Sequence, residues 1–126
     1  MVAYLDTHVM TTLAAGKVER LSPKAAQLIR RAELLLSPMA LLELEFLYEI
    51  GRSRLRARDL FKKVAHETGV QMCELPFSAV VEAGLTEGWT RDPFDRLIVA
   101  NAKANGFAWL ISSDEKIAKN YPRTAW

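Results

Sequence analysis

The sequence predicts an α/β sandwich with a small, mostly parallel sheet. Two observations support this prediction. Short apolar runs typical of strands alternate along the chain with longer segments of helical periodicity. The first of these runs, Val2–Leu5, also lacks the polar–apolar alternation of a strand with one face in solvent, so it should be buried on both faces, as in a parallel sheet. The 126 residues are expected to form one domain, residues 1–126.

The N-terminal third of the chain contains two predicted strands with helices between them. The first strand is the β-rich run Val2–Leu5, and the helical segment after it stops at Gly16. A second helix has Ser22 as its N-cap and Pro23 at its first position, and both residues favour a helix start there. The second predicted strand is Leu34–Ser37.

The rest of the chain continues the alternation. Helices are predicted over residues 39–51 and 56–69, each ending at a glycine, and then a strand over Val70–Leu75 and a helix over residues 77–88.

The C-terminal part begins with a helix that Pro93 opens and Gly106 closes, followed by a fourth strand, Phe107–Ser112, and a short helix over residues 114–121. Ligands of parallel sheets bind outside the carboxyl ends of the strands, so we expect functional residues directly after these strands.

Composition and charge exclude several classes of protein. The net charge of +2 permits a nucleic-acid partner without demanding one. The single cysteine, Cys73, excludes an internal disulfide and suits a reducing compartment. The N-terminus lacks the features of a signal peptide, and no apolar run is long enough to span a membrane. We therefore expect a soluble cytoplasmic protein. The absence of a glycine-rich phosphate loop argues against an NTPase.

Two aspartates follow predicted strands. Asp6 comes directly after the first strand and Asp114 comes after the fourth, so both should lie at the carboxyl edge of the sheet. Taken singly, each is better explained as a helix N-cap, because aspartate is favoured at that position.

A third acid lies among apolar residues of a helix. On a helical projection, Glu43 falls inside a stripe that should face the core, whereas Glu45 points away and should be solvated. A buried carboxylate needs a partner, which could be an arginine in a structural ion pair or a metal at an active site. The stripe consists of Met39, Leu42, Phe46, Leu47 and Ile50.

The segment TRDPFDRLIVANA supplies two more acids. Asp92 precedes Pro93 and is the natural N-cap of the helix, so we assign it mainly to structure. Asp95 lies in the first turn on the face of Val99 and Ala102, and we assign it mainly to function.

The four candidate acids are Asp6, Glu43, Asp95 and Asp114. If the sheet brings them together, their mutual repulsion raises their pKa values and destabilises the fold unless a cation compensates. Mg²⁺ or Mn²⁺ is the natural choice, because hard divalent cations prefer oxygen ligands and readily accept phosphate oxygens. Such a site can activate water for attack on a phosphodiester.

With these residues in place, the chain resembles the PIN-domain ribonucleases, specifically the VapC-type toxins of toxin–antitoxin pairs. The resemblance rests on YLDTHV, SPMALLE, RDPFDRLIVANA and LISSDEKI, in this order over nearly the whole chain. It implies a compact α/β/α sandwich that cleaves RNA with Mg²⁺ or Mn²⁺. The family's four acids match Asp6, Glu43, Asp95 and Asp114, which the resemblance therefore makes the metal-binding and catalytic residues.

The chain departs from the family pattern at two positions near the acids. Ala40 replaces the second serine of the lead-in to Glu43, and Thr12 stands where close relatives often carry tryptophan. Neither change removes an acid. Thr7 and Ser113 each adjoin an acid, where a hydroxyl could orient a ligand or could simply cap a helix or form a turn.

Basic residues provide candidate contacts to RNA. Arg91 and Arg96 flank the acids and are the better candidates for phosphate binding. The dense basic segment Arg52–Lys63 reads equally well as an RNA phosphate track and as a solvated helix face.

The leading interpretation is a metal-dependent endoribonuclease that acts as a toxin. The resemblance implies an RNA substrate, a cognate VapB-type antitoxin and a homodimer. The antitoxin is expected to dock on the apolar helix Met39–Ile50, with Leu41, Leu44 and Tyr48 partly exposed. The alternative is a non-catalytic module of the same fold that binds RNA or an antitoxin, although such a module has no need of clustered buried charge.

Overall fold

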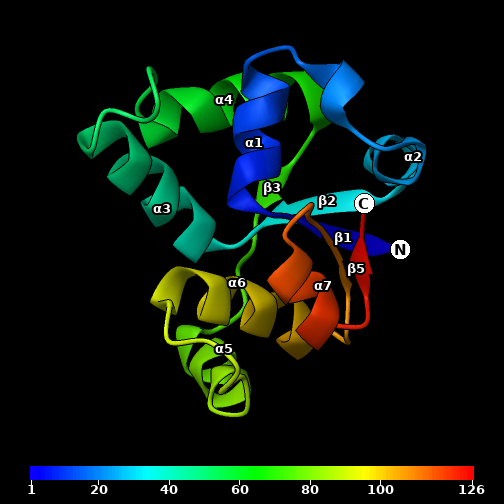
Figure 1. The fold of residues 1–126 in the computed structure, drawn as a ribbon, viewed down its shortest axis with the longest axis vertical. Coiled ribbons are helices and arrows are strands. Elements are labelled where there is room, and N and C mark those ends of the chain that lie inside the picture. Colours follow the sequence, from blue (N-terminus) through cyan, green and yellow to red (C-terminus); the bar gives the residue numbers. More distant parts are fainter.

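The computed structural model describes residues 1–126. Its centre is a five-stranded sheet in the order β3-β2-β1-β4-β5, and every neighbouring pair of strands is parallel (Figure 1). The chain builds β1, β2 and β3 in one direction and then crosses to the other side of β1 to build β4 and β5. The topological switch point therefore lies between β1 and β4. The strands are β1 (Val2–Leu5), β2 (Glu33–Leu36), β3 (Gln71–Met72), β4 (Trp109–Ile111) and β5 (Thr124–Ala125).

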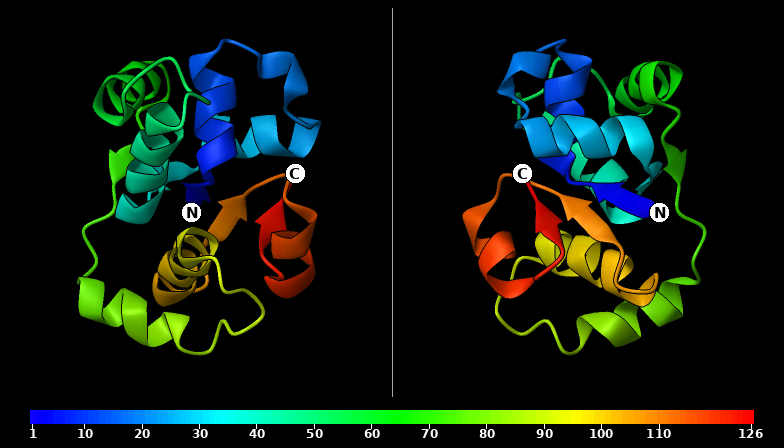
Figure 2. Two further views of the ribbon diagram at one scale, coloured as in Figure 1. Left: turned by 60° about the vertical axis from the view of Figure 1, so that its left-hand side comes forward. Right: turned by 90° about the vertical axis from the view of Figure 1, so that its right-hand side faces the viewer.

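Helices cover both faces of the sheet. Helices α1 to α4 lie on one side and α5 to α7 on the other, which gives the three layers seen in Figures 1 and 2. The helices are α1 (Thr7–Ala14), α2 (Pro23–Arg31), α3 (Pro38–Glu49), α4 (Ala57–Thr68), α5 (Phe77–Gly84), α6 (Pro93–Ala104) and α7 (Glu115–Asn120), with a 3₁₀ turn, η1 (Val18–Arg20), between α1 and α2. None of them has the length and apolar character that crossing a bilayer requires.

The predicted α/β sandwich is confirmed, with two differences in the sheet. The third strand is only two residues long, and β5, which the sequence analysis did not predict, adds a fifth strand. β5 is defined by pairing, because Thr124 and Ala125 align with Leu110 and Ile111 of β4. A run of two residues carries no periodicity from which a strand could be predicted.

Side-chain caps fix the starts of the helices. The Ser22 hydroxyl accepts a hydrogen bond from the Ala25 N–H at the start of α2, where Pro23 occupies the first turn. The Ser37 hydroxyl accepts from the Met39 N–H in the same way at the start of α3. These local bonds explain why helix starts were predictable from sequence.

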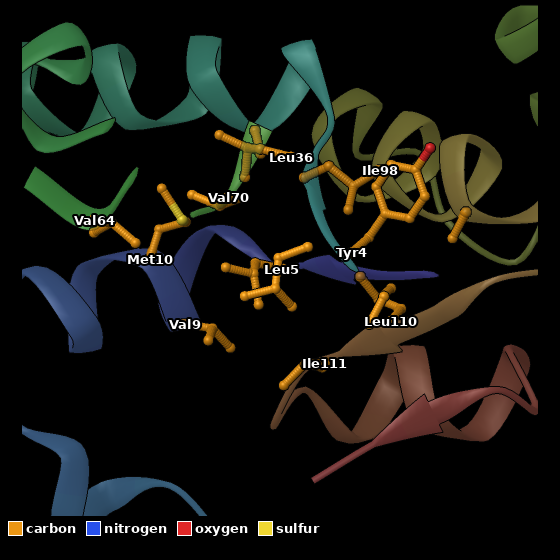
Figure 3. Close-up of a cluster of buried hydrophobic side chains, with 14 of the residues drawn as sticks. Tyr4, Leu5, Val9, Met10, Leu36, Val64, Val70, Ile98, Leu110 and Ile111 are labelled. Atoms are coloured by element: carbon orange, nitrogen blue, oxygen red, sulfur yellow. The ribbon is translucent and has the colours of Figure 1, made fainter. Parts of the chain in front are cut away.

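One hydrophobic core joins the two helical layers through the sheet. The central strand β1 is buried on both faces, since Ala3, Tyr4 and Leu5 are all fully buried. Figure 3 shows its side chains packed against α1 on one side and α6 on the other. The residues labelled there are Tyr4, Leu5, Val9, Met10, Leu36, Val64, Val70, Ile98, Leu110 and Ile111.

The buried face of α3 differs from the predicted stripe. Leu42, Phe46 and Ile50 are 56%, 43% and 49% exposed. Of the predicted stripe, Leu47 is buried and Met39 packs partly buried against the core. The helix also buries Ala40 and Leu44, which the stripe did not include. Apolar residues occur on several sides of α3, so their periodicity did not identify the face that packs against the rest of the fold.

Candidate active site

Two of the candidate acids begin helices at the carboxyl edge of the sheet, at the switch point. Asp6 follows β1 and is the N-cap of α1, and Asp114 follows β4 and is the N-cap of α7. The strand ends are adjacent, because Leu5 aligns with Ile111 and the Asp6 N–H donates to the Ile111 carbonyl over 3.0 Å. Open parallel sheets bind their ligands at this position, outside the carboxyl ends of the strands at the switch point.

Asp6 is the most buried of the acids, with 4% of its surface exposed. One carboxylate oxygen accepts the Thr7 N–H over 2.8 Å, and the other accepts the Ser112 hydroxyl over 2.7 Å. The same Ser112 oxygen accepts the N–H of Asp114 over 3.0 Å. Ser112 therefore ties Asp6 to the start of α7. Burial raises the pKa of Asp6, while the hydrogen bonds from Ser112 and Thr7 oppose this rise.

Glu43 joins the same edge from α3. The hydroxyl of the buried Thr7 donates to its carboxylate over 2.5 Å, which links α1 to α3. Burial raises the pKa of Glu43, and the nearby charge of Asp6 raises it further, while the Thr7 hydrogen bond lowers it. No arginine pairs with Glu43, so the structural ion pair considered in the sequence analysis is absent.

Asp92 and Asp95 stand at the start of α6. The Asp92 carboxylate caps the helix by accepting the N–H of Phe94 over 2.8 Å and the N–H of Asp95 over 3.4 Å. The Asp95 carboxylate is half-buried and accepts no hydrogen bond from the protein. Its pKa is raised to about 7, first by burial and then by the surrounding carboxylates of Asp92, Asp6, Asp114 and Glu43.

Asp6 and Asp114 follow adjacent strand ends, and Thr7, next to Asp6, contacts Glu43. Asp95 is connected to them only by electrostatics: after burial, the charges of the neighbouring carboxylates raise its pKa. No three histidine, cysteine, aspartate or glutamate side chains lie close enough together to ligate one ion directly in this arrangement. Donors of this kind hold a hard cation partly through water, because Mg²⁺ usually keeps several of its own waters.

The other predicted contact residues lie in different settings. Arg96 donates from Nε to the Gly84 carbonyl over 2.9 Å and from Nη2 to the Leu85 carbonyl, so it caps the C-terminus of α5. Arg91 is exposed and donates to the Gly88 carbonyl over 2.8 Å.

Two residues have roles that sequence reasoning missed. Ser112, rather than the exposed Ser113, contacts the acids, because the register of β1 and β4 sets it beside Asp6. Glu45 is not simply solvated: it accepts the Ala57 N–H at the start of α4 and pairs with Arg56. Both roles depend on pairing between distant segments, so no local pattern signals them.

Comparison with known proteins identifies the family of this chain. The profile of the PIN-domain family matches residues 3–121, which is most of the chain. The chain belongs to the PIN-domain family. None of the curated proteins compared matches it.

Solved structures share the PIN fold at low sequence identity. A chain of VapBC2 from Rickettsia felis, bound to a DNA fragment from their promoter, has a TM-score of 0.62 and 17% identity, covering 98% of this chain and 96% of that chain. DNA-bound VapBC from Salmonella typhimurium gives a TM-score of 0.62, 17% identity and coverages of 98% and 95%. VapBC-1 from nontypeable Haemophilus influenzae gives a TM-score of 0.58 and 17% identity, covering 100% of this chain and 96% of that chain. At this level of identity the likeness shows the fold.

Proposed function

We propose that residues 1–126 form one PIN domain that acts as a metal-dependent endoribonuclease, the VapC-type toxin of a toxin–antitoxin pair. The observation that supports it is the position of Asp6 and Asp114 at adjacent strand ends, with Thr7 joining Glu43 to the same region. The half-buried Asp95 has a pKa raised to about 7 beside the other carboxylates. A protein gains nothing in stability from this arrangement, since each carboxylate disfavours the ionisation of its neighbours.

The donor set fits a divalent cation. Asp6, Glu43, Asp95 and Asp114 offer only hard oxygen donors, and nitrogen or sulfur donors are absent from the group. These four side chains would hold Mg²⁺ or Mn²⁺. When bound, the ion supplies a water of lowered pKa and stabilises charge on a phosphodiester.

The protein's own groups orient the acids. Ser112 and the Thr7 N–H hold both oxygens of Asp6, so its carboxylate cannot rotate freely. The Thr7 hydroxyl holds Glu43 in the same manner. Fixed carboxylates lower the cost of reorganisation when charge develops on a substrate.

The proposed partners follow from the relatives and from the surface. The neighbouring structures are VapBC assemblies, which supports a VapB-type antitoxin as the partner of this chain. We also propose a cytoplasmic location, where an RNA substrate is accessible. Of the residues expected to be exposed for docking, Leu41 and Tyr48 are partly exposed, whereas Leu44 is fully buried and its assignment is wrong. Leu42 and Phe46 of α3, and Ile50 directly after it, are exposed as well. α5 exposes a second apolar row, Phe77, Val81 and Leu85. We propose that the exposed face of α3 binds the antitoxin and that the α5 row contributes to a homodimer.

The test is RNA cleavage by the purified protein with Mg²⁺, Mn²⁺ or EDTA. Wild type should cleave only with a metal, and Asp6→Asn should reduce the rate at least about a hundredfold, which corresponds to a loss of about 2.7 kcal/mol of transition-state stabilisation. Asp59→Asn is the matched control, because Asp59 is exposed at the start of α4. Binding of RNA or an antitoxin without cleavage would instead support the non-catalytic module.

A further inference from the structure

A concave surface of about 720 Å³ lies at the far end of α1 from the acids. The end of α1, the segment leading into η1 and the loop between α3 and α4 form its walls. We call it the cationic pocket after its four basic side chains, Lys17, Arg20, Arg52 and Arg54. The hydroxyls of Thr12 and Ser53 also line it.

The charge of this pocket is uncompensated. No acidic residue lines it. The chain forms two ion pairs, Arg56–Glu45 and Lys103–Glu87, and neither includes any of the four cations. Their side chains also donate no hydrogen bond within the protein. The chain as a whole carries a net charge of only +2, so four unpaired cations around one concavity are a local concentration of charge. Such a concentration attracts a polyanion.

The same two helices connect the acids with the pocket. α1 begins at the acids, and its eight residues extend about 12 Å at 1.5 Å per residue. Thr7, in the first turn, contacts Glu43, whereas Thr11, one turn further along, lines the pocket. α3 carries Glu43, and the loop that follows it, between α3 and α4, holds Arg52 and Arg54. The acids and the cationic pocket therefore lie at opposite ends of α1, about two helical turns apart.

The acids themselves repel a phosphate backbone, so affinity for RNA must come from elsewhere on the surface. Lysine and arginine supply most of the affinity of nucleic-acid interfaces. Long, exposed cationic side chains beside hydroxyl groups suit the backbone of a flexible single strand.

We propose that the cationic pocket is a phosphate-binding subsite for a single-stranded RNA substrate, a few nucleotides away from the bond at the acids. This inference rests on the proposed function, because it assigns the anion to the same RNA. Under this proposal Lys17, Arg20, Arg52 and Arg54 bind RNA phosphates. Arg91 and Arg96 do not line the pocket and are not part of this subsite.

Binding is measured with a fluorescein-labelled 12-nucleotide single-stranded RNA by anisotropy, with EDTA present and at several salt concentrations. The double variants Arg52→Gln/Arg54→Gln and Lys17→Gln/Arg20→Gln should each weaken binding at least tenfold at low salt. The slope of log K against log salt should fall by about 0.7 for each phosphate that a variant no longer neutralises. Arg30→Gln/Arg31→Gln is the matched control, since it removes the same charge from an exposed part of α2.

Cleavage provides a second readout. With metal, the pocket variants should lower kcat/KM for the 12-nucleotide RNA but leave cleavage of a dinucleotide unchanged, because a dinucleotide does not reach the pocket. Equal weakening of RNA binding by the pocket variants and the control variant would overturn the inference. Displacement of the RNA by poly-L-glutamate, at a charge concentration much lower than that of the RNA, would also overturn it and would assign the pocket to an acidic protein. If wild type binds RNA through the pocket but cleaves nothing, the subsite stands and the proposed nuclease activity fails.

Discussion

Replacing Asp95 by asparagine should stabilise the metal-free protein at alkaline pH. The pKa of Asp95 is raised from 3.8 to about 7, by burial and by the surrounding carboxylates. In the unfolded chain this group ionises near its ordinary value. Because its pKa is higher in the folded state, the folded state holds the proton longer. The stabilisation is thus complete below about pH 4 and is lost as the pH rises toward 7.

The magnitude follows from the same values. The pKa of Asp95 differs by about 3 units between the unfolded and folded states, and at 1.36 kcal/mol per unit this corresponds to at most about 4 kcal/mol of folding free energy. Asp95 is half-buried, and solvent screening reduces this to about 1–2 kcal/mol. Asparagine has the same shape, and the Asp95 carboxylate accepts no hydrogen bond that the change would break. The variant should therefore exceed wild type by about 1–2 kcal/mol at pH 8 in EDTA, after subtraction of a small helix-dipole contribution of about 0.5 kcal/mol.

The assay is urea denaturation at pH 5, 6.5 and 8 with EDTA at 0.15 M salt. The free-energy difference between Asp95→Asn and wild type should grow across this series. Asp59→Asn serves as the control and should show no comparable growth. A variant that is less stable than wild type at pH 8, or a difference that is independent of pH, would refute the electrostatic reasoning.

Four further outcomes test the structure. Ser112→Ala should lower the free energy of unfolding by about 1–3 kcal/mol, because it leaves an oxygen of buried Asp6 without a donor, while Ser112→Thr should recover part of the loss in the same urea titration. Leu44→Ala should lower the free energy of unfolding by about 2–5 kcal/mol and Leu42→Ala by less than about 1 kcal/mol, as measured by thermal and urea denaturation. A larger loss for Leu42→Ala than for Leu44→Ala would support the buried face that was predicted from sequence. Arg96→Gln should lower the free energy of unfolding by about 1 kcal/mol, because the cap on the C-terminus of α5 is lost. A large loss of RNA affinity without destabilisation would instead support a role of Arg96 in substrate binding. Excess Mn²⁺ should raise the melting temperature of wild type, with a gain of about 2.7 kcal/mol at a hundredfold excess over Kd, and Asp6→Asn should abolish most of this gain.

Sequence predicted the features that depend on neighbours in the chain. Asp6 and Asp114 were assigned to strand ends because strand, cap and helix follow one another directly. The N-cap role of Asp92 follows in the same way from Pro93. Such local rules predicted every α-helix and four of the five strands.

Features that depend on distant segments were not predictable. The role of Ser112 requires the register between β1 and β4, which only the folded sheet provides. The buried face of α3 is chosen by its packing against other helices, because apolar residues occur on several sides of the helix. Glu45 caps α4 from a different helix, eleven residues before Arg56, with which it also pairs.

The hydrogen bonds of the acids suggest where a cation would gain most under the proposed function. Asp6 is held by Thr7 and Ser112, Glu43 is held by Thr7, and Asp114 accepts the Ile117 N–H over 3.0 Å. Protein donors thus already compensate part of the charge on three of the four acids, whereas Asp95 receives none. Asp95 is thus the acid whose charge no protein donor compensates, and burial and the neighbouring carboxylates raise its pKa. A bound cation would therefore relieve more repulsion at Asp95 than at the other acids, and the carboxylates held by hydrogen bonds would keep their orientation whether or not the cation is present.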